Sequence, residues 1–214
     1  MDAARRPIKS RSNQFIQRLS AWLAGRGFTP NSISIASMGF AASGSAALAW
    51  MPLQAGALIC ALGVQLRLLC NVVDGIVAVE HGKKSPVGAI YNELPDRVAD
   101  TLFFLSLGYA VDSLALGWCA ALLAMATAYI RVLGGALGLA QDFRGPMAKQ
   151  HRMALLTVCC VLVVFEFGAW QTHYSLSVAL WGITLGSFVT CATRLRAMAG
   201  LLQTNADAEN RGDA

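Results

Sequence analysis

The sequence has few charged residues. Only 14% of its 214 residues are Asp, Glu, Lys or Arg, whereas 56% are hydrophobic, and the mean hydropathy is +0.52. A soluble domain usually carries about 25% charged residues, so this composition argues against a soluble protein and predicts an integral membrane protein. About six spanning helices of roughly 20 residues each would use most of the chain.

Residue patterns that mark several common kinds of site are also missing. The six cysteines lie in apolar stretches without CxxC spacing, which argues against a zinc site or a disulfide framework. The three histidines are scattered near loops and cannot form a hydrolase triad or a zinc signature, and no GxGxxG dinucleotide fingerprint occurs. The chemistry must therefore come from other residues.

The apolar runs predict an all-α membrane bundle with six spanning helices. They lie near 30–51, 55–79, 87–111, 114–139, 153–171 and 174–195. Lys and Arg occur before the first run, in the loops 80–86 and 140–152 and after the last run, whereas the alternate connections hold none. Because cytoplasmic loops are enriched in Lys and Arg, both termini are predicted to be cytoplasmic in a bacterial inner membrane. The net charge of +5 therefore indicates topology and not nucleic-acid binding.

Three parts of the chain can be separated. Residues 1–28 predict a cytoplasmic, amphipathic interfacial helix, because apolar side chains recur at helical spacing opposite Gln14 and Arg18. A helix that packs against a partner protein is the alternative. Residues 29–200 form the predicted six-helix membrane domain, and the polar residues 201–214 predict a disordered cytoplasmic tail.

One polar run, from residue 71 to residue 100, interrupts the apolar pattern. Carboxylates inside a membrane are costly and therefore indicate a functional site. Asn71 and Asp74 are three residues apart, and Asn92, Asp96 and Asp100 are spaced by four, so each set lines one helix face. Two antiparallel helices joined by a short loop would bring the two faces to similar depth. Oxygen donors from two helices suit a hard cation such as Mg²⁺ or Mn²⁺.

Helix packing is the alternative explanation for these acids. Glu93 and Arg97 have the i,i+4 spacing of an ion pair. Asp96 or Asp100 could likewise be neutralised by Arg97 or by Arg131. Packing alone explains poorly why small residues lie one helical turn from the acids, where they leave room for a ligand.

The polar run also follows a fixed order. Its residues fall without a gap on the eight fixed positions of the pattern D-x2-D-G-x2-A-R-x8-G-x3-D-x3-D, in the order Asn71, Asp74, Gly75, Ala78, Val79, Gly88, Asn92 and Asp96. In this respect the chain resembles the CDP-alcohol phosphotransferases, whose signature the pattern is. The resemblance extends to the TPN sequence at 29–31 and implies six spanning helices, an amphipathic N-terminal helix and a possible homodimer.

The resemblance implies a transferase of phospholipid biosynthesis. Such an enzyme moves a phosphatidyl or similar phospho-alcohol group from a CDP-linked lipid, such as CDP-diacylglycerol, to an alcohol acceptor and releases CMP. It implies Asp96 as the catalytic base, and one or two Mg²⁺ or Mn²⁺ ions held by Asn71, Asp74, Asn92 and Asp96, with Asp100 as a further candidate. The implied cytidine pocket consists of Gly75, Ala78 and Gly88.

The chain departs from the signature at three positions. Asn71 and Asn92 replace two acids, and Val79 replaces the Arg, so the formal charge of the four acidic positions falls from −4 to −2. Two interpretations stay open: an active enzyme with a changed substrate or metal count, and a catalytically silent CDP-lipid-binding relative. A small cation- or proton-coupled transporter is a third, although the sequence shows no convincing internal repeat.

Basic residues near the cytoplasmic side are candidates for binding a phosphorylated acceptor. Arg144, Lys149 and Arg152 precede or begin the fifth apolar run, where the resemblance implies an acceptor site. Ordinary positive loop charge explains them equally well. Arg131 lies inside the fourth apolar run, and an intramembrane Arg is expected to face a cavity or a partner.

Overall fold

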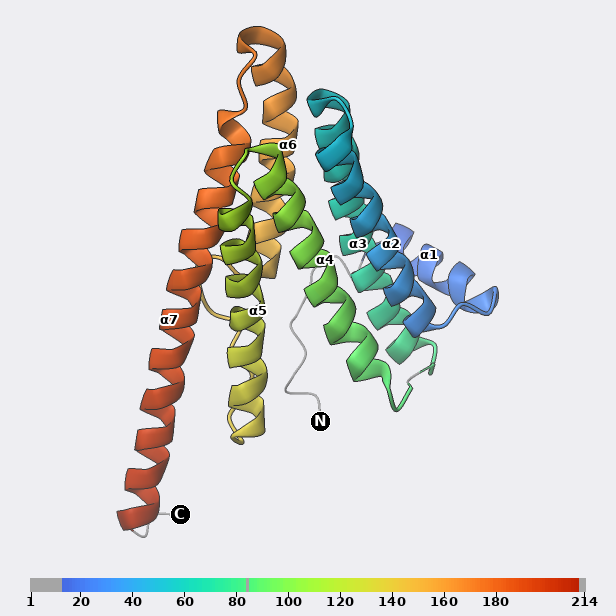
Figure 1. The fold of residues 1–214 in the computed structure, drawn as a ribbon. Helices are drawn as coiled ribbons and strands as arrows, with labels where there is room; N and C mark the ends of the chain where they lie inside the picture. Colours follow the sequence, from blue (N-terminus) through green and yellow to red (C-terminus); the bar gives the residue numbers. More distant parts are fainter. Residues whose placement is uncertain (1–12, 84, 212–214) are drawn as a thin grey trace.

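The computed structural model describes residues 13–83 and 85–211, and every regular element within these ranges is an α-helix (Figure 1). The helices are α1 (Gln14–Gly25), α2 (Pro30–Trp50), α3 (Leu53–Glu80), α4 (Gly88–Ala110), α5 (Leu114–Ala136), α6 (Lys149–Trp170) and α7 (Tyr174–Arg211). The predicted all-α class is confirmed for this part of the chain. Five basic residues used for the predicted topology lie outside the described residues: Arg5, Arg6, Lys9, Arg11 and Lys84.

Five helices are long and apolar enough to cross a membrane, namely α2, α3, α5, α6 and α7. Helix α4 has 23 residues and is therefore about 35 Å long, which also matches a bilayer core of roughly 30 Å. Its polar residues, which include Glu93, Asp96 and Asp100, lower its hydropathy. The composition of the helices supports an integral membrane protein.

The six long helices pack as a ring. Neighbours around the ring follow the order α3, α2, α4, α5, α7 and α6, and α6 packs back against α3. Helices α3 and α4 make little direct contact, whereas α2 packs against both of them. The polar faces of α3 and α4 meet through side chains, since Arg67 and Asn71 of α3 reach Asp96 of α4.

The N-terminal helix joins the ring through a short turn. Gly27 adopts a left-handed backbone conformation with φ +88°, and Thr29 then caps α2 in a reciprocal capping box with Ser32. The ammonium group of Lys83 donates hydrogen bonds to the carbonyl oxygens of Ala24 (2.7 Å) and Phe28 (3.3 Å). The connection between α3 and α4 therefore holds the end of α1.

The C-terminal end differs from the sequence prediction. A disordered tail was expected from residue 201, but α7 continues to Arg211. Residues 201–211 contain no Gly or Pro and several good helix formers, so nothing in them ends the helix. At 38 residues, α7 is about 57 Å long and exceeds the thickness of a bilayer core.

Glycines allow two pairs of helices to approach closely. Gly63 of α3 faces Gly44 of α2, and a Cβ atom added at Gly63 would lie 2.7 Å from the carbonyl oxygen of Phe40. Gly117 of α5 faces Gly108 of α4 in the same way, and its added Cβ would lie 2.7 Å from the carbonyl oxygen of Phe104. Small residues serve this purpose in membrane helices generally.

Replacing Gly63 with alanine should destabilise the bundle. The new methyl group would push α3 away from α2, and overpacking of this kind costs about 1–3 kcal/mol. Thermal unfolding of the detergent-purified protein measures the effect. The matched control is Gly39→Ala in α2, where an added Cβ meets nothing within 4 Å and the better helix propensity of alanine should keep or raise the unfolding temperature. Equal unfolding temperatures for the two variants would contradict the close α2–α3 contact.

Candidate active site

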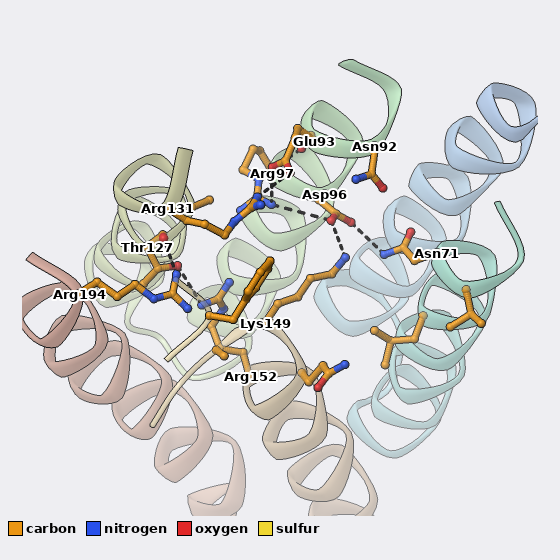
Figure 2. A pocket seen from close by; sticks show the side chains of 16 residues that line it. Asn71, Asn92, Glu93, Asp96, Arg97, Thr127, Arg131, Lys149, Arg152 and Arg194 are labelled. Atoms are coloured by element: carbon orange, nitrogen blue, oxygen red, sulfur yellow. Dashed lines mark hydrogen bonds and ion pairs between the residues drawn. The ribbon is translucent and has the colours of Figure 1, made fainter. Parts of the chain in front are cut away.

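A cavity of about 420 Å³ opens between α3, α4, α5, α6 and α7 (Figure 2). Polar side chains from all five helices line it, together with Phe143 and Ala148 from the connection between α5 and α6. Its charged lining residues are Glu93, Asp96, Arg97, Arg131, Lys149, Arg152 and Arg194. Five of these seven residues are cationic, so the cavity favours an anionic ligand.

Asp96 is the most densely bonded acid of the cavity. One carboxylate oxygen accepts hydrogen bonds from the Arg67 guanidinium at 3.1 Å and the Asn71 amide nitrogen at 2.9 Å, and the other accepts from the Lys149 ammonium at 2.5 Å. Figure 2 shows the bonds from Asn71 and Lys149. Its side chain is 12% exposed. Donors from α3 and α6 therefore fix this carboxylate at the cavity wall.

Asp100 lies one turn further along α4 and is almost completely buried. It accepts hydrogen bonds from Arg67 at 2.7 Å and from Arg152 at 3.0 Å. Both arginines are at most 1% exposed. Asp100 does not line the cavity, and its partners come from α3 and α6, not from Arg131.

Asp74 does not line the cavity. It is buried and accepts a 2.6 Å hydrogen bond from the hydroxyl of Ser34 on α2. Asn71, Asn92 and Asp96 line the cavity, whereas Asp74 does not. The small residues of the signature also lie outside the lining: Gly75, Ala78 and Gly88.

Glu93 forms ion pairs with two arginines at the edge of the cavity. It pairs with Arg97 at 3.4 Å, as the i,i+4 spacing predicted, and with Arg131 at 2.5 Å. Arg131 also donates to Gln141 at 2.7 Å and lies over the ring of Phe143 at 5.5 Å. The intramembrane Arg131 therefore faces the cavity and also has polar partners, as expected for an arginine in an apolar run.

The basic residues near the start of α6 have different surroundings. Lys149 and Arg152 line the cavity, whereas Arg144 lies outside its lining, pairs with Asp142 at 3.0 Å and is 63% exposed. Slight burial tends to raise the pKa of Asp142, but hydrogen bonds from the side chain and backbone of Arg144 outweigh it and lower that pKa. The acceptor candidates are therefore Arg131, Lys149 and Arg152.

Two important arginines were missed in the sequence. Arg67 bonds to both acids of α4, and Arg194 lines the cavity and donates to the carbonyl oxygens of Thr127 and Arg144. Arg67 lies inside an apolar run, so the argument that drew attention to Arg131 applies to it equally. Arg194 lies at the edge of the last predicted span, where it cannot be told from a loop charge.

The donor set can be compared with the needs of a divalent-metal centre. Within residues 13–83 and 85–211, no three Asp, Glu, His or Cys side chains are close enough to hold a metal ion. Both oxygens of Asp96 already accept from cations or an amide, and Asp74 binds Ser34. An ion with only oxygen ligands needs several such groups, so these residues do not fit a two-ion centre.

No protein-family model matches the chain, but curated proteins do. The phosphatidylinositol phosphate synthase of Mycobacteroides abscessus is 29% identical over 192 residues, which cover 84% of this chain and 81% of that protein. The enzyme of the same name from Mycobacterium marinum is 30% identical over 182 residues, 79% of this chain and 73% of that protein. The archaetidylinositol phosphate synthase of Aeropyrum pernix is 30% identical over 171 residues, 78% of this chain and 84% of that protein.

Solved structures share the fold. The phosphatidylinositol phosphate synthase of Mycobacterium tuberculosis with CDP-DAG bound has a TM-score of 0.74 at 23% identity, covering 87% of this chain and 94% of that chain. The same enzyme in complex with manganese and citrate has a TM-score of 0.73 at 23% identity, covering 86% and 88%. With two relatives at 30% identity over most of their length, this chain belongs to the CDP-alcohol phosphotransferase family.

Proposed function

We propose that the chain transfers a phosphatidyl group from a CDP-linked lipid such as CDP-diacylglycerol to an alcohol acceptor in phospholipid biosynthesis, with release of CMP. The observation that carries the proposal is Asp96, the last acid of the signature, held at the wall of a strongly cationic cavity. The names of the relatives support the reaction class.

The chemistry follows from the residues around Asp96. The acceptor hydroxyl attacks the phosphorus that carries the diacylglycerol, and Asp96 takes the hydroxyl proton. The bond from this phosphorus to the bridging oxygen breaks, and CMP leaves with the electron pair. Lys149 and the arginines of the cavity stabilise the negative charge that develops on the phosphate oxygens.

The acceptor in this proposal is a phosphorylated alcohol. Arg131 and Arg152 lie on the part of the lining formed by α5 and α6, and Arg152 is held there by Thr127 at 3.2 Å. A guanidinium group binds phosphate with charge-assisted, often bidentate hydrogen bonds. Because three relatives make inositol-containing lipid phosphates by name, an inositol phosphate is the first acceptor to test.

The membrane arrangement in this proposal has six spans. Helix α4 is the sixth, since its buried acids Asp96 and Asp100 face cations from α3 and α6 and not lipid. Lys83 in the loop after α3 and Arg144 in the connection from α5 to α6 are basic, which favours the cytoplasmic side for both connections. The cavity then opens to the cytoplasm, where soluble acceptors are found.

Replacing Asp96 with asparagine should lower CMP release by roughly 10²–10⁴-fold, because the amide cannot accept the acceptor proton. CMP is measured from purified protein given CDP-diacylglycerol and a panel of acceptors. The matched control is Asp112→Asn in the turn between α4 and α5, where φ is 53° and asparagine is well tolerated. The catalytic proposal fails if the native protein binds donor but releases no more CMP than the Asp96 variant with any acceptor, which is the behaviour of a silent binder.

Replacing Arg131 with glutamine should raise the KM for a phosphorylated acceptor about tenfold or more. A hydrogen bond to a charged group is worth about 1.5–3 kcal/mol, and 1.4 kcal/mol corresponds to a factor of about ten. The KM for CDP-diacylglycerol should change less than about twofold, and Arg144→Gln is the control outside the lining. An unchanged acceptor KM in the Arg131 variant would place the acceptor elsewhere.

A further inference from the structure

We propose that Lys149, Arg67 and the Asn71 amide take over the role of a divalent ion at Asp96, so that this chain binds the pyrophosphate of its donor without a divalent cation. The inference rests on the proposed function for the identity of the donor, a CDP-linked lipid. It concerns the two positions at which the chain departs from the acidic signature.

Asn71 is in direct contact with Asp96. The Asn71 amide nitrogen lies 2.9 Å from a carboxylate oxygen of Asp96. An acid at position 71 would bring two negatively charged oxygens to this distance, and such a pair requires a cation between them or a shared proton. The amide donates a hydrogen bond instead. Asparagine therefore makes the pair stable without an ion.

Cationic side chains surround the Asp96 carboxylate. Arg67 is fully buried, and its guanidinium is also held by Asp100 at 2.7 Å and by the backbone oxygen of Asp96 at 3.2 Å. Lys149 is 26% exposed at the first residue of α6 and covers the second carboxylate oxygen. Asp96 is therefore compensated by a fixed guanidinium, by a lysine that reaches it from the cavity side and, at 3.8 Å, by Arg97 of the same helix.

The second amide of the signature, Asn92, is free to contact a ligand. Asn92 lines the cavity, and among the described residues its side chain has no hydrogen-bond partner (Figure 2). Its amide group can donate to a phosphate oxygen, whereas an aspartate at this position would repel one. Both changes from acid to amide therefore favour direct contact between protein and phosphate.

The cavity as a whole has an excess of positive charge. Its lining carries five cationic and two anionic side chains, which leaves an excess of positive charge for an anionic ligand. A pyrophosphate diester carries two negative charges, and Arg and Lys side chains bind phosphate directly. The protein itself therefore supplies the countercharge that metal ions supply in a site with four acids.

The test measures binding of CDP-diacylglycerol to the full-length protein in detergent by calorimetry, once with EDTA and once with Mn²⁺. For the native protein, the Kd measured with EDTA and the Kd measured with Mn²⁺ should agree within about threefold. The double variant Asn71→Asp, Asn92→Asp should bind at least about tenfold more weakly in EDTA and recover in Mn²⁺. Bound Mn²⁺ is counted by electron paramagnetic resonance, and only the double variant should gain ions at the site.

A second variant isolates the lysine. Lys149→Met should weaken donor binding in EDTA about tenfold or more, and Arg144→Met is the charge-matched control outside the lining. The inference is overturned if the native protein binds donor only with Mn²⁺, if it binds two Mn²⁺ ions, or if it binds no donor under either condition.

CMP release measured on the same samples separates this inference from the proposed function. Donor binding in EDTA without any CMP formation would support the inference and defeat the proposed transfer. If donor binding and CMP formation both require Mn²⁺, the proposed transfer is supported and the inference is defeated.

Discussion

The structure depends on a buried ion network centred on Asp100. This acid of α4 pairs with Arg67 of α3 and Arg152 of α6, and all three side chains are almost completely excluded from solvent. Removing one member of a buried charge network leaves an uncompensated charge and typically costs about 3–5 kcal/mol. Because α3 and α4 have little direct contact, this network and the hydrogen bond from Asn71 to Asp96 join them through side chains. Arg67 of the network also reaches Asp96 at the cavity wall.

The sequence was sufficient to predict the positions of the long helices and the helix faces on which the polar residues lie. Hydropathy located the ends of the long helices to within a few residues, except for α7, which continues from the predicted end at residue 195 to Arg211. The motif spacing identified Asp96, Asn71 and Asn92, which line the cavity. Periodicity assigns a residue to a helix face but does not say which helix it meets. The contact of Asp74 with Ser34, forty positions away in the chain, could not be predicted for this reason. The order of helices around the ring, in which α3 and α4 are not neighbours, also could not be predicted from the sequence.

The charges explain why the altered signature is compatible with a functional site. Two acids have become amides, and the carboxylates that remain on α4 are matched by Arg67, Arg152 and Lys149. In a medium of low polarity an unmatched charge is expensive, so fewer acids and several fixed cations form a consistent set. The excess of positive charge lies in the cavity, where an anionic substrate can use it.

The most direct test of this account is a crystal structure of the protein grown with CDP-diacylglycerol and Mn²⁺, with anomalous data collected at the manganese edge. Pyrophosphate oxygens are expected within hydrogen-bond distance of Lys149, and no anomalous peak is expected beside Asp96. Manganese bound between Asp96 and the pyrophosphate, with Lys149 displaced from the carboxylate, would contradict it.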